Sequence, residues 1–306
     1  MKILIIQQRR GIGDCIIFLP YIHAISKKFN SKVSLLIKEN SRAVDLLAED
    51  EHIGEIITLS DEKDGLMGIF KLSNEIKNKK FDKVFIFNSS LRYNLIAKFA
   101  GIKSIYQYPL FRSKDNIVNS AKIFTESVIG KIVSTEANLK IKSSGDNTNK
   151  NIKKICIAIA ASGPTKIWPI QNFIRLCEEL SKNQKCKFYI AAGKNDIELI
   201  KKFKNSNVGE NSESFEELTI KETLPIIKSC NLTIANDTGF AHISAALGVK
   251  TLTLFMDSPV LSYGRYSTRM VTIEPDGEKN STKHDTLGKD KISFTKVLSE
   301  TLKLLN

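Results

Sequence analysis

Short apolar runs followed by helical patterns recur along this chain, and this alternation constrains its fold more than any other feature. Residues 2–6 are predicted to form a buried strand, residues 7–13 a loop, and residues 15–29 a helix with one apolar side. The same order recurs at residues 32–48 and 83–99. Strands that alternate with helices form a parallel sheet with helices on both faces. The first part of the chain is therefore predicted to be an α/β domain.

A polar stretch near the middle of the chain separates this alternation from a second one. Between Ile141 and Asn151 the sequence reads Lys-Ser-Ser-Gly-Asp-Asn-Thr-Asn-Lys and has no apolar period, so we place a domain boundary there. The strands and helices predicted beyond it cover residues 155–160, 170–180, 187–191, 196–203, 221–229, 232–235, 251–255 and 292–305. We expect two Rossmann-like, doubly wound domains, residues 1–145 and 151–290, followed by a C-terminal helix, residues 291–306. Ligands of such sheets bind at the carboxyl ends of the strands, so we expect the domains to face a central cleft.

Composition excludes several classes of protein. A chain of 306 residues that is 42% hydrophobic and 26% charged is typical of a soluble globular protein with two domains. The apolar run at the N-terminus is too short for a signal peptide, and no segment approaches the length of a membrane span. The five cysteines are scattered and form no C-x-x-C pair, which indicates reduced thiols and a cytoplasmic location.

The formal net charge is +13, and the excess lies more in the first half, where residues 1–150 carry 24 basic and 16 acidic side chains. Such an excess of positive charge suits an anionic partner. The candidates are a phosphorylated substrate, an anionic membrane surface and nucleic acid. The alternative is that abundant Lys, Ile and Asn reflect only an AT-rich genome. Basic patches with interleaved aromatic residues are absent from the sequence, so we expect no nucleic-acid partner.

The most informative motif follows the strand predicted at residues 232–235. Small apolar residues after Gly239 predict a helix there, and the start of a helix presents unpaired N–H groups to which anions bind. Thr238 can add a hydroxyl donor, Gly239 allows a phosphate to approach closely, and His242 lies within the first turn. The alternative is that Asp237 or Thr238 only caps the helix and that His242 is a core residue. An aspartic protease would need a second Asp-Thr-Gly copy in a β-rich setting.

A second motif, Gly11-Ile12-Gly13-Asp14, follows the first predicted strand. It resembles a dinucleotide fingerprint, but Ile16 stands where the third glycine is needed, so the signal is weak. The two glycines allow a substrate to approach closely, and Asp14 is expected to project into the cleft and accept a proton. The alternative is that Asp14 is the N-cap of the helix, worth about 1 kcal/mol.

A third motif follows the strand predicted at residues 155–160. Ser162, Thr165 and Lys166 supply hydroxyls and an ammonium group, and Trp168-Pro169 is expected to anchor the next helix. A loop lysine is often merely solvated. A position opposite the Asp-Thr-Gly turn favours contact with a diphosphate instead, because lysine acts as a point charge on phosphate.

Taken together, these motifs resemble glycosyltransferase family 9, which has a GT-B fold and contains the ADP-heptose:lipopolysaccharide heptosyltransferases. The resemblance runs in the family's order over nearly the whole chain. Its pieces are Gly11-x-Gly13-Asp14 with Leu19-Pro20, Ser162 to Pro169 with its Lys-x-Trp-Pro core, Gly193, Asn236-Asp237-Thr238-Gly239-x-x-His242 with Ala245-Ala246-Leu247-Gly248, and Leu254-Phe255 before Asp257-x-Pro259.

The resemblance implies an inverting transfer of heptose from ADP-heptose to a sugar of the inner lipopolysaccharide core. Asp14 matches the family's general base, and Lys166 the lysine that contacts the donor phosphates. The donor-binding residues that it implies are Ser162, Lys166, Asp237, Thr238, Gly239, His242 and Glu198, with Asp196 as the alternative to Glu198. Arg10, Gly11 and Gly13 would form the loop on the acceptor side.

The resemblance further implies no cofactor and no metal ion, and the sequence has no Asp-x-Asp motif in a suitable loop. Lys166 and the helix start near Thr238 would neutralise the departing diphosphate. The expected partners are a nucleotide sugar and an anionic, lipid-linked saccharide, with the protein held peripherally at the cytoplasmic face of the inner membrane.

The chain departs from the family at Ala161, where a hydroxyl residue is frequent, and over residues 275–289, which match no family pattern. A transferase that uses another nucleotide sugar is therefore one alternative. A nucleotide-sugar epimerase on the same fold is a second, and a non-catalytic binder of nucleotide sugars or nucleic acid is a third.

Overall fold

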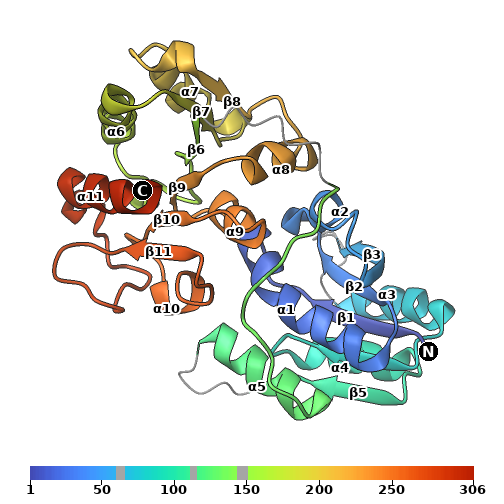
Figure 1. The fold of residues 1–306 in the computed structure, drawn as a ribbon. Coiled ribbons are helices and arrows are strands. Elements are labelled where there is room, and N and C mark those ends of the chain that lie inside the picture. The colour runs from blue at the N-terminus through green and yellow to red at the C-terminus, as the bar shows by residue number, and fades with distance from the viewer. Residues whose placement is uncertain (60–65, 111–115, 143–150) are drawn as a thin grey trace. The chain divides into compact units, whose positions relative to one another are not determined.

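The computed structural model describes residues 1–59, 66–110, 116–142 and 151–306. The chain forms two compact units, Met1–Lys140 and Ile141–Asn306. Each unit is a parallel sheet with helices packed on it (Figure 1). Most of the polar stretch in which we placed the domain boundary, residues 143–150, lies outside the described residues.

The sheet of the first unit has five parallel strands in the order β3-β2-β1-β4-β5. These strands are β1 Ile3–Gln7, β2 Val33–Lys38, β3 Ile53–Leu59, β4 Lys83–Ile86 and β5 Ser104–Gln107. Every residue of β1 is buried, as expected for the central strand of a sheet that is covered on both faces. The strand order reverses between β1 and β4, so the ligand-binding edge of this unit is predicted beyond the ends of these two strands.

Helices cover both faces of this sheet. They are α1 Ile12–Phe29, α2 Ala43–Leu46, α3 Leu66–Lys79, α4 Leu91–Phe99 and α5 Ile117–Ile129, with a 3-10 turn η1 at Glu39–Ser41. Leu4 and Ile6 pack in one apolar cluster with residues of α3 and α4. On the other face Phe87 lies edge-on to Phe18 of α1 and to Phe124 of α5, with ring centroids 5.5 and 5.2 Å apart. The helices α1 and α5 therefore share the face opposite α3 and α4.

The second unit has six parallel strands in the order β11-β10-β9-β6-β7-β8. Its strands are β6 Lys153–Ala158, β7 Cys186–Ile190, β8 Ser212–Ser214, β9 Leu232–Asn236, β10 Thr251–Leu254 and β11 Met270–Ile273. Its α-helices are α6 Ile170–Asn183, α7 Ile197–Lys204, α8 Ile220–Lys228, α9 Gly239–Ala246, α10 Val260–Tyr263 and α11 Phe294–Leu305. Its 3-10 turns are η3 Pro164–Lys166, η4 Lys194–Asp196, η5 Gly209–Asn211 and η6 Lys289–Lys291. The strand order reverses between β6 and β9, so their loops share the switch point.

Two doubly wound parallel sheets confirm the predicted α/β class. Helix α1 begins at Ile12 rather than at Cys15, and the helix predicted at residues 43–48 is a single turn, Ala43–Leu46. The sequence did not predict β3, α3, β5, α5, β8, α10 or β11. None of the helices in the described parts of the chain has both the length and the apolar character that a membrane span requires.

Candidate functional site

Two loops at the switch point of the second unit bring together residues that are far apart in sequence. Lys166 ends the turn η3 that follows β6, and Asp237 comes directly after β9. Because β6 and β9 are neighbours, the Lys166 ammonium nitrogen lies 4.0 Å from the Oδ2 atom of Asp237. The predicted lysine and the predicted Asp-Thr-Gly turn therefore meet at the edge of the sheet where ligands of such folds bind.

His242 lies in the first turn of α9 and is 3% exposed. Its Nε2 atom is 3.8 Å from the Oδ1 atom of Asp237, and its Nδ1 atom is 2.9 Å from the hydroxyl of Tyr266. The ring of Tyr266 also stacks on the imidazole. His242 is thus held beside Asp237 by a tyrosine that sequence reasoning did not single out.

The Asp237 carboxylate is surrounded by groups that favour its ionised form. Burial alone would raise the pKa of Asp237, but the His242 ring, the hydroxyl of Ser258, which donates to Oδ2, and the Lys166 ammonium outweigh it, so the pKa is lowered. Asp237 is therefore an anion, with the His242 ring beside one carboxylate oxygen and the Lys166 ammonium beside the other.

The cap of α9 differs from the alternative that the sequence left open. Thr238 is the N-cap residue, but its side chain makes no capping hydrogen bond, and Asp237 directs its carboxylate to Ser258 instead. The helix begins at Gly239, so its first N–H groups have no side-chain cap. Uncapped N–H groups at the positive end of a helix are a favourable place for an anion.

A second carboxylate holds the loop that carries Lys166. The hydroxyl of Thr165 donates to the Oδ2 atom of Asp257 over 2.7 Å, and the backbone N–H of Leu287 donates to its Oδ1 atom over 3.2 Å. Burial would raise the pKa of Asp257, but these bonds and the nearby Lys166 lower it. The Asp257-x-Pro259 motif was the available signal, although the sequence alone gave Asp257 no role.

Asn236, the last residue of β9, joins the same loop to the sheet. Its side chain is fully buried, accepts from the backbone N–H of Trp168 over 3.1 Å and donates to the carbonyl of Ile159 over 2.8 Å. The buried indole of Trp168 donates to the carbonyl of Ile292 over 3.1 Å. These bonds fix the loop from both sides and so fix the origin of the Lys166 side chain.

The remaining residues predicted for this site are more open. Ser162 is exposed in the loop after β6. The carboxylate of Glu198 on α7 is 76% exposed and lies 3.0 Å from Lys201. Asp196 accepts from the backbone N–H of Gly193 over 3.1 Å and so closes the turn after β7. Neither acidic residue joins the cluster around Asp237 in the structure.

In the first unit the predicted loop follows β1. Gly11 is the N-cap of α1 at φ 98°, a conformation that favours glycine, and Asp14 lies in the first helical turn. The reading of Asp14 as the N-cap is therefore wrong. Its Oδ1 atom lies 2.8 Å from the Nε atom of Arg9, a partner that the sequence reasoning missed, while Arg10 is exposed and Gly13 lies within the helix.

The ends of β1 and β4 are also joined in the first unit. The backbone N–H of Gln8 donates to the Oδ1 atom of Asn88 over 2.8 Å, and Gln107 donates to the carbonyl of Asn88 over 2.7 Å. The side-chain amide of Gln7 is fully buried and has no hydrogen-bond partner among the residues that the structure describes. Hydrogen bonds therefore tie the ends of β1, β4 and β5 together at this edge.

Solved structures with the same architecture identify the fold. The ADP-heptose lipopolysaccharide heptosyltransferase II of E. coli aligns over 100% of this chain and 98% of its own, with a TM-score of 0.77 and 18% identity. A family 9 glycosyl transferase from Veillonella parvula aligns over 99% and 97%, with a TM-score of 0.80 and 18% identity. The two doubly wound sheets and their similarity to these structures assign the protein to the GT-B fold class, as predicted.

The sequence then identifies the family. The family model described as glycosyltransferase family 9 (heptosyltransferase) matches residues 131–291, slightly more than half of the chain. The chain belongs to this family. Lipopolysaccharide heptosyltransferase 1 of Campylobacter coli is 25% identical over 203 residues, which are 64% of this chain and 56% of that protein. The match thus spans little more than half of the length of this relative.

Proposed function

We propose that this protein is an inverting glycosyltransferase that moves heptose from ADP-heptose to a sugar of the inner lipopolysaccharide core. Its family supports the class of reaction, and the relatives named above support heptose and lipopolysaccharide. The observation that carries the proposal is the Lys166–Asp237 pair beside the uncapped first turn of α9. This arrangement suits a nucleoside diphosphate.

In this proposal Lys166 and the first turn of α9 bind the donor diphosphate. Thr238 adds its hydroxyl, and Gly239 allows close approach of a phosphate oxygen. Asp237 would repel a phosphate if it stood alone, but Ser258, His242 and Lys166 surround its charge. Asp237 therefore holds Lys166 in position while the Lys166 ammonium group binds the diphosphate.

The charge that develops on the leaving ADP is the main electrostatic demand of the reaction. Fixed donors that face developing charge lower the barrier because they need no reorganisation during the step. Lys166 is fixed by the bonds of Thr165 and Asn236 on either side of its loop. Ser162 and the acidic residue after Gly193, Glu198 or Asp196, are proposed to bind the rest of the donor.

Asp14 is the proposed general base. Inversion in one displacement requires a group that removes the proton of the acceptor hydroxyl as the sugar is transferred. Arg9 lies against one carboxylate oxygen of Asp14, and the other would accept the proton of the acceptor hydroxyl. Arg10, Gly11 and Gly13 would form the acceptor side of this loop, and Gly11 contributes a turn that a larger residue would strain.

The proposed acceptor is an anionic, lipid-linked saccharide, reached from the cytoplasmic face of the inner membrane. The net charge of +13 would attract both this acceptor and an anionic lipid surface. Peripheral association with that surface is part of the proposal.

The donor can be tested by ligand-induced stabilisation of the purified protein. ADP-heptose, GDP-mannose, UDP-glucose and NAD would be titrated while the melting temperature is followed, because a ligand of the native state raises it by mass action. A selective response to ADP-heptose is expected. A selective response to another nucleotide sugar would reassign the donor, and a response to none of them would contradict the proposed site.

A nucleotide-sugar epimerase on the same fold is separated by its product. An epimerase changes the sugar while it remains attached to the nucleotide. A transferase releases ADP only when an acceptor is present. Chromatography of the nucleotide products with and without acceptor therefore distinguishes the two reactions, and acceptor-dependent release of ADP is the expected result.

A further inference from the structure

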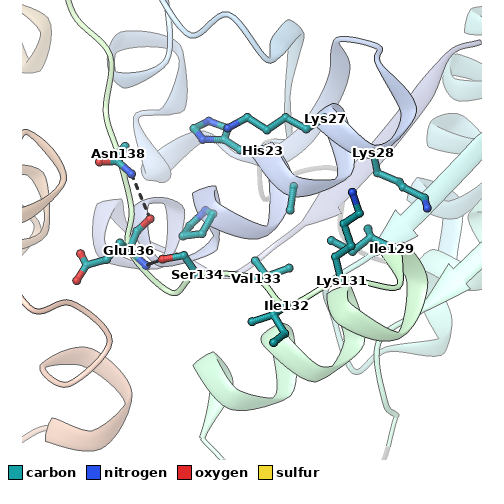
Figure 2. Close-up of a pocket in the computed structure, with 12 residues that line it drawn as sticks. His23, Lys27, Lys28, Ile129, Lys131, Ile132, Val133, Ser134, Glu136 and Asn138 are labelled. Atoms are coloured by element: carbon teal, nitrogen blue, oxygen red, sulfur yellow. Dashed lines mark hydrogen bonds between the residues drawn. The ribbon is translucent and has the colours of Figure 1, made fainter.

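A cavity of about 590 Å³ lies in the first unit, away from the residues discussed so far. It is formed by the second half of α1 and by the segment that follows α5 (Figure 2). Asp14 stands in the first turn of α1, whereas Lys27 and Lys28 stand in its last turn. A helix rises 1.5 Å per residue, so the two ends are about 20 Å apart along its axis. The lining residue of α1 nearest to Asp14 is Pro20, about 9 Å from it along the axis, so the cavity does not include Asp14.

The charged lining of this cavity favours an anion. Lys27 and Lys28 of α1 and Lys131 of the following segment all line it, and all three side chains are exposed. Among the residues that the structure describes, none of these three ammonium groups forms an ion pair with a carboxylate. The acidic residue of the lining is Glu136, and Figure 2 shows its carboxylate directed away from the lysines.

The rest of the lining is apolar or hydrogen-bonding. Pro20, Ala24 and Val133 supply apolar surface, and Ser134 and Asn138 supply polar groups. Ile132, at the same cavity, is 90% exposed. A large aliphatic side chain gains free energy when it leaves water, so an isoleucine exposed to this degree beside three lysines fits an amphiphile better than a fully hydrated anion.

We propose that this cavity binds the phosphate headgroup of an anionic phospholipid and that Ile132 enters the lipid beside it. Lysine ammonium groups bind phosphate as point charges, and each lysine near an anionic membrane strengthens binding by about fivefold. The cavity would thereby dock the first unit on a membrane surface. The inference rests on the proposed function only in that a lipid-linked acceptor must be reached at a membrane.

The test is co-sedimentation of the full-length protein with vesicles, which needs neither donor nor acceptor. Vesicles of phosphatidylcholine with about a third phosphatidylglycerol would be compared with phosphatidylcholine alone. The variant Lys27→Gln/Lys28→Gln/Lys131→Gln is expected to bind the anionic vesicles at least about tenfold more weakly than the wild type. Ile132→Ser is expected to weaken binding several-fold while it leaves the salt dependence unchanged.

Matched controls lie on the opposite face of the same sheet. Lys71, Lys77 and Lys98 are exposed on α3 and α4, so Lys71→Gln/Lys77→Gln/Lys98→Gln removes the same charge. Phe70 of α3 is 58% exposed and stacks on Phe99, so Phe70→Ser controls for the loss of an exposed apolar side chain. Both controls are expected to bind vesicles nearly as the wild type does. Circular dichroism melting of each variant verifies that it is folded.

Three outcomes would overturn the proposal. One is equal loss of binding in the cavity variant and in its charge-matched control, which would make the attraction a general effect of net charge. Another is a larger loss in Phe70→Ser than in Ile132→Ser, which would place the membrane on the other face. The third is displacement from vesicles by millimolar inorganic phosphate at constant ionic strength, which would make the cavity a site for free phosphate. Failure of the proposed function is recognised separately, because the cavity variant should still transfer sugar to a delipidated acceptor.

Discussion

The ammonium nitrogen of Lys166 lies 4.0 Å from the Oδ2 atom of Asp237, although the two residues leave different strands of the second sheet. The pair exists because β6 and β9 are neighbours at the point where the strand order reverses. Asp237 thereby holds the lysine beside the first turn of α9. A basic side chain and free helical N–H groups at one place are what a diphosphate requires.

Replacement of Lys166 tests this arrangement. Lys166→Met keeps the length of the side chain and removes its charge, and a lost hydrogen bond to a charged group costs about 1.5–3 kcal/mol. We therefore expect donor affinity to fall by roughly 10- to 100-fold, as measured by calorimetric titration. Lys182→Met on α6, where the exposed lysine pairs with Glu179, is the control and should bind the donor normally.

The bonds of Asn236 predict a structural cost. Asn236→Leu leaves the buried N–H of Trp168 and the carbonyl of Ile159 without their side-chain partner. The free energy of unfolding is expected to fall by about 2–4 kcal/mol in urea titrations. Asn231→Leu loses one exposed bond to the backbone N–H of Lys154 and should cost less. Equal losses in the two variants would contradict the role given to Asn236.

Glu274 predicts part of the acid sensitivity of the fold. Burial would raise the pKa of Glu274, but the backbone N–H groups of Asn280, Thr282 and Ser281 lower it below its ordinary value of 4.5. A carboxylate with a lowered pKa stabilises the native state above the unfolded pKa, and this stability is lost as the pH falls through the native pKa.

Glu274→Gln is therefore expected to lower the free energy of unfolding by about 1–3 kcal/mol at neutral pH. The difference from the wild type should shrink as the pH falls below 4.5. Urea unfolding over this pH range is the measurement. Parallel curves for the two proteins at every pH would show that Glu274 does not contribute to the acid sensitivity.

Two adjacent glutamines at the end of β1 predict opposite effects of the same substitution. Within the described parts of the chain the buried amide of Gln7 has no partner, whereas the Nε2 atom of Gln8 donates to the carbonyl of Leu36 over 2.8 Å. Gln7→Met is expected to raise the free energy of unfolding by about 1 kcal/mol, and Gln8→Met to lower it by about the same amount. Thermal unfolding compares them, and a destabilised Gln7→Met would indicate an internal water on that amide.

The sequence alone predicted the strands and helices in which the local pattern of residues is strong. The strands β1, β9 and β10 are apolar or β-branched apart from Gln7 and Asn236, the last residues of β1 and β9. Helix α4 was predicted with the bounds that the structure gives. The strand β5 is only half-buried, and β8 reads Ser-Glu-Ser, so both depend on pairing with a neighbouring strand. Such strands carry little signal of their own.

The residues of the candidate site likewise divide into those that a local pattern predicted and those that it did not. Lys166, Asp237 and His242 were predicted because each follows a recognisable strand, and parallel strands end at a common edge. The hydrogen bond of Thr165 to Asp257 and that of His242 to Tyr266 join different loops, so no local pattern reveals them. Arg9 was missed because helix α1 begins earlier than expected and brings Asp14 into its first turn.

The most direct test of the central claim is the rate of transfer from ADP-heptose to a purified inner-core acceptor by the wild type and by Asp14→Asn. The account predicts acceptor-dependent release of ADP by the wild type and a loss of at least about 100-fold in Asp14→Asn, with donor binding unchanged. Near-normal transfer by Asp14→Asn would remove Asp14 as the base, and no transfer by the wild type from any nucleotide sugar would contradict the proposed activity.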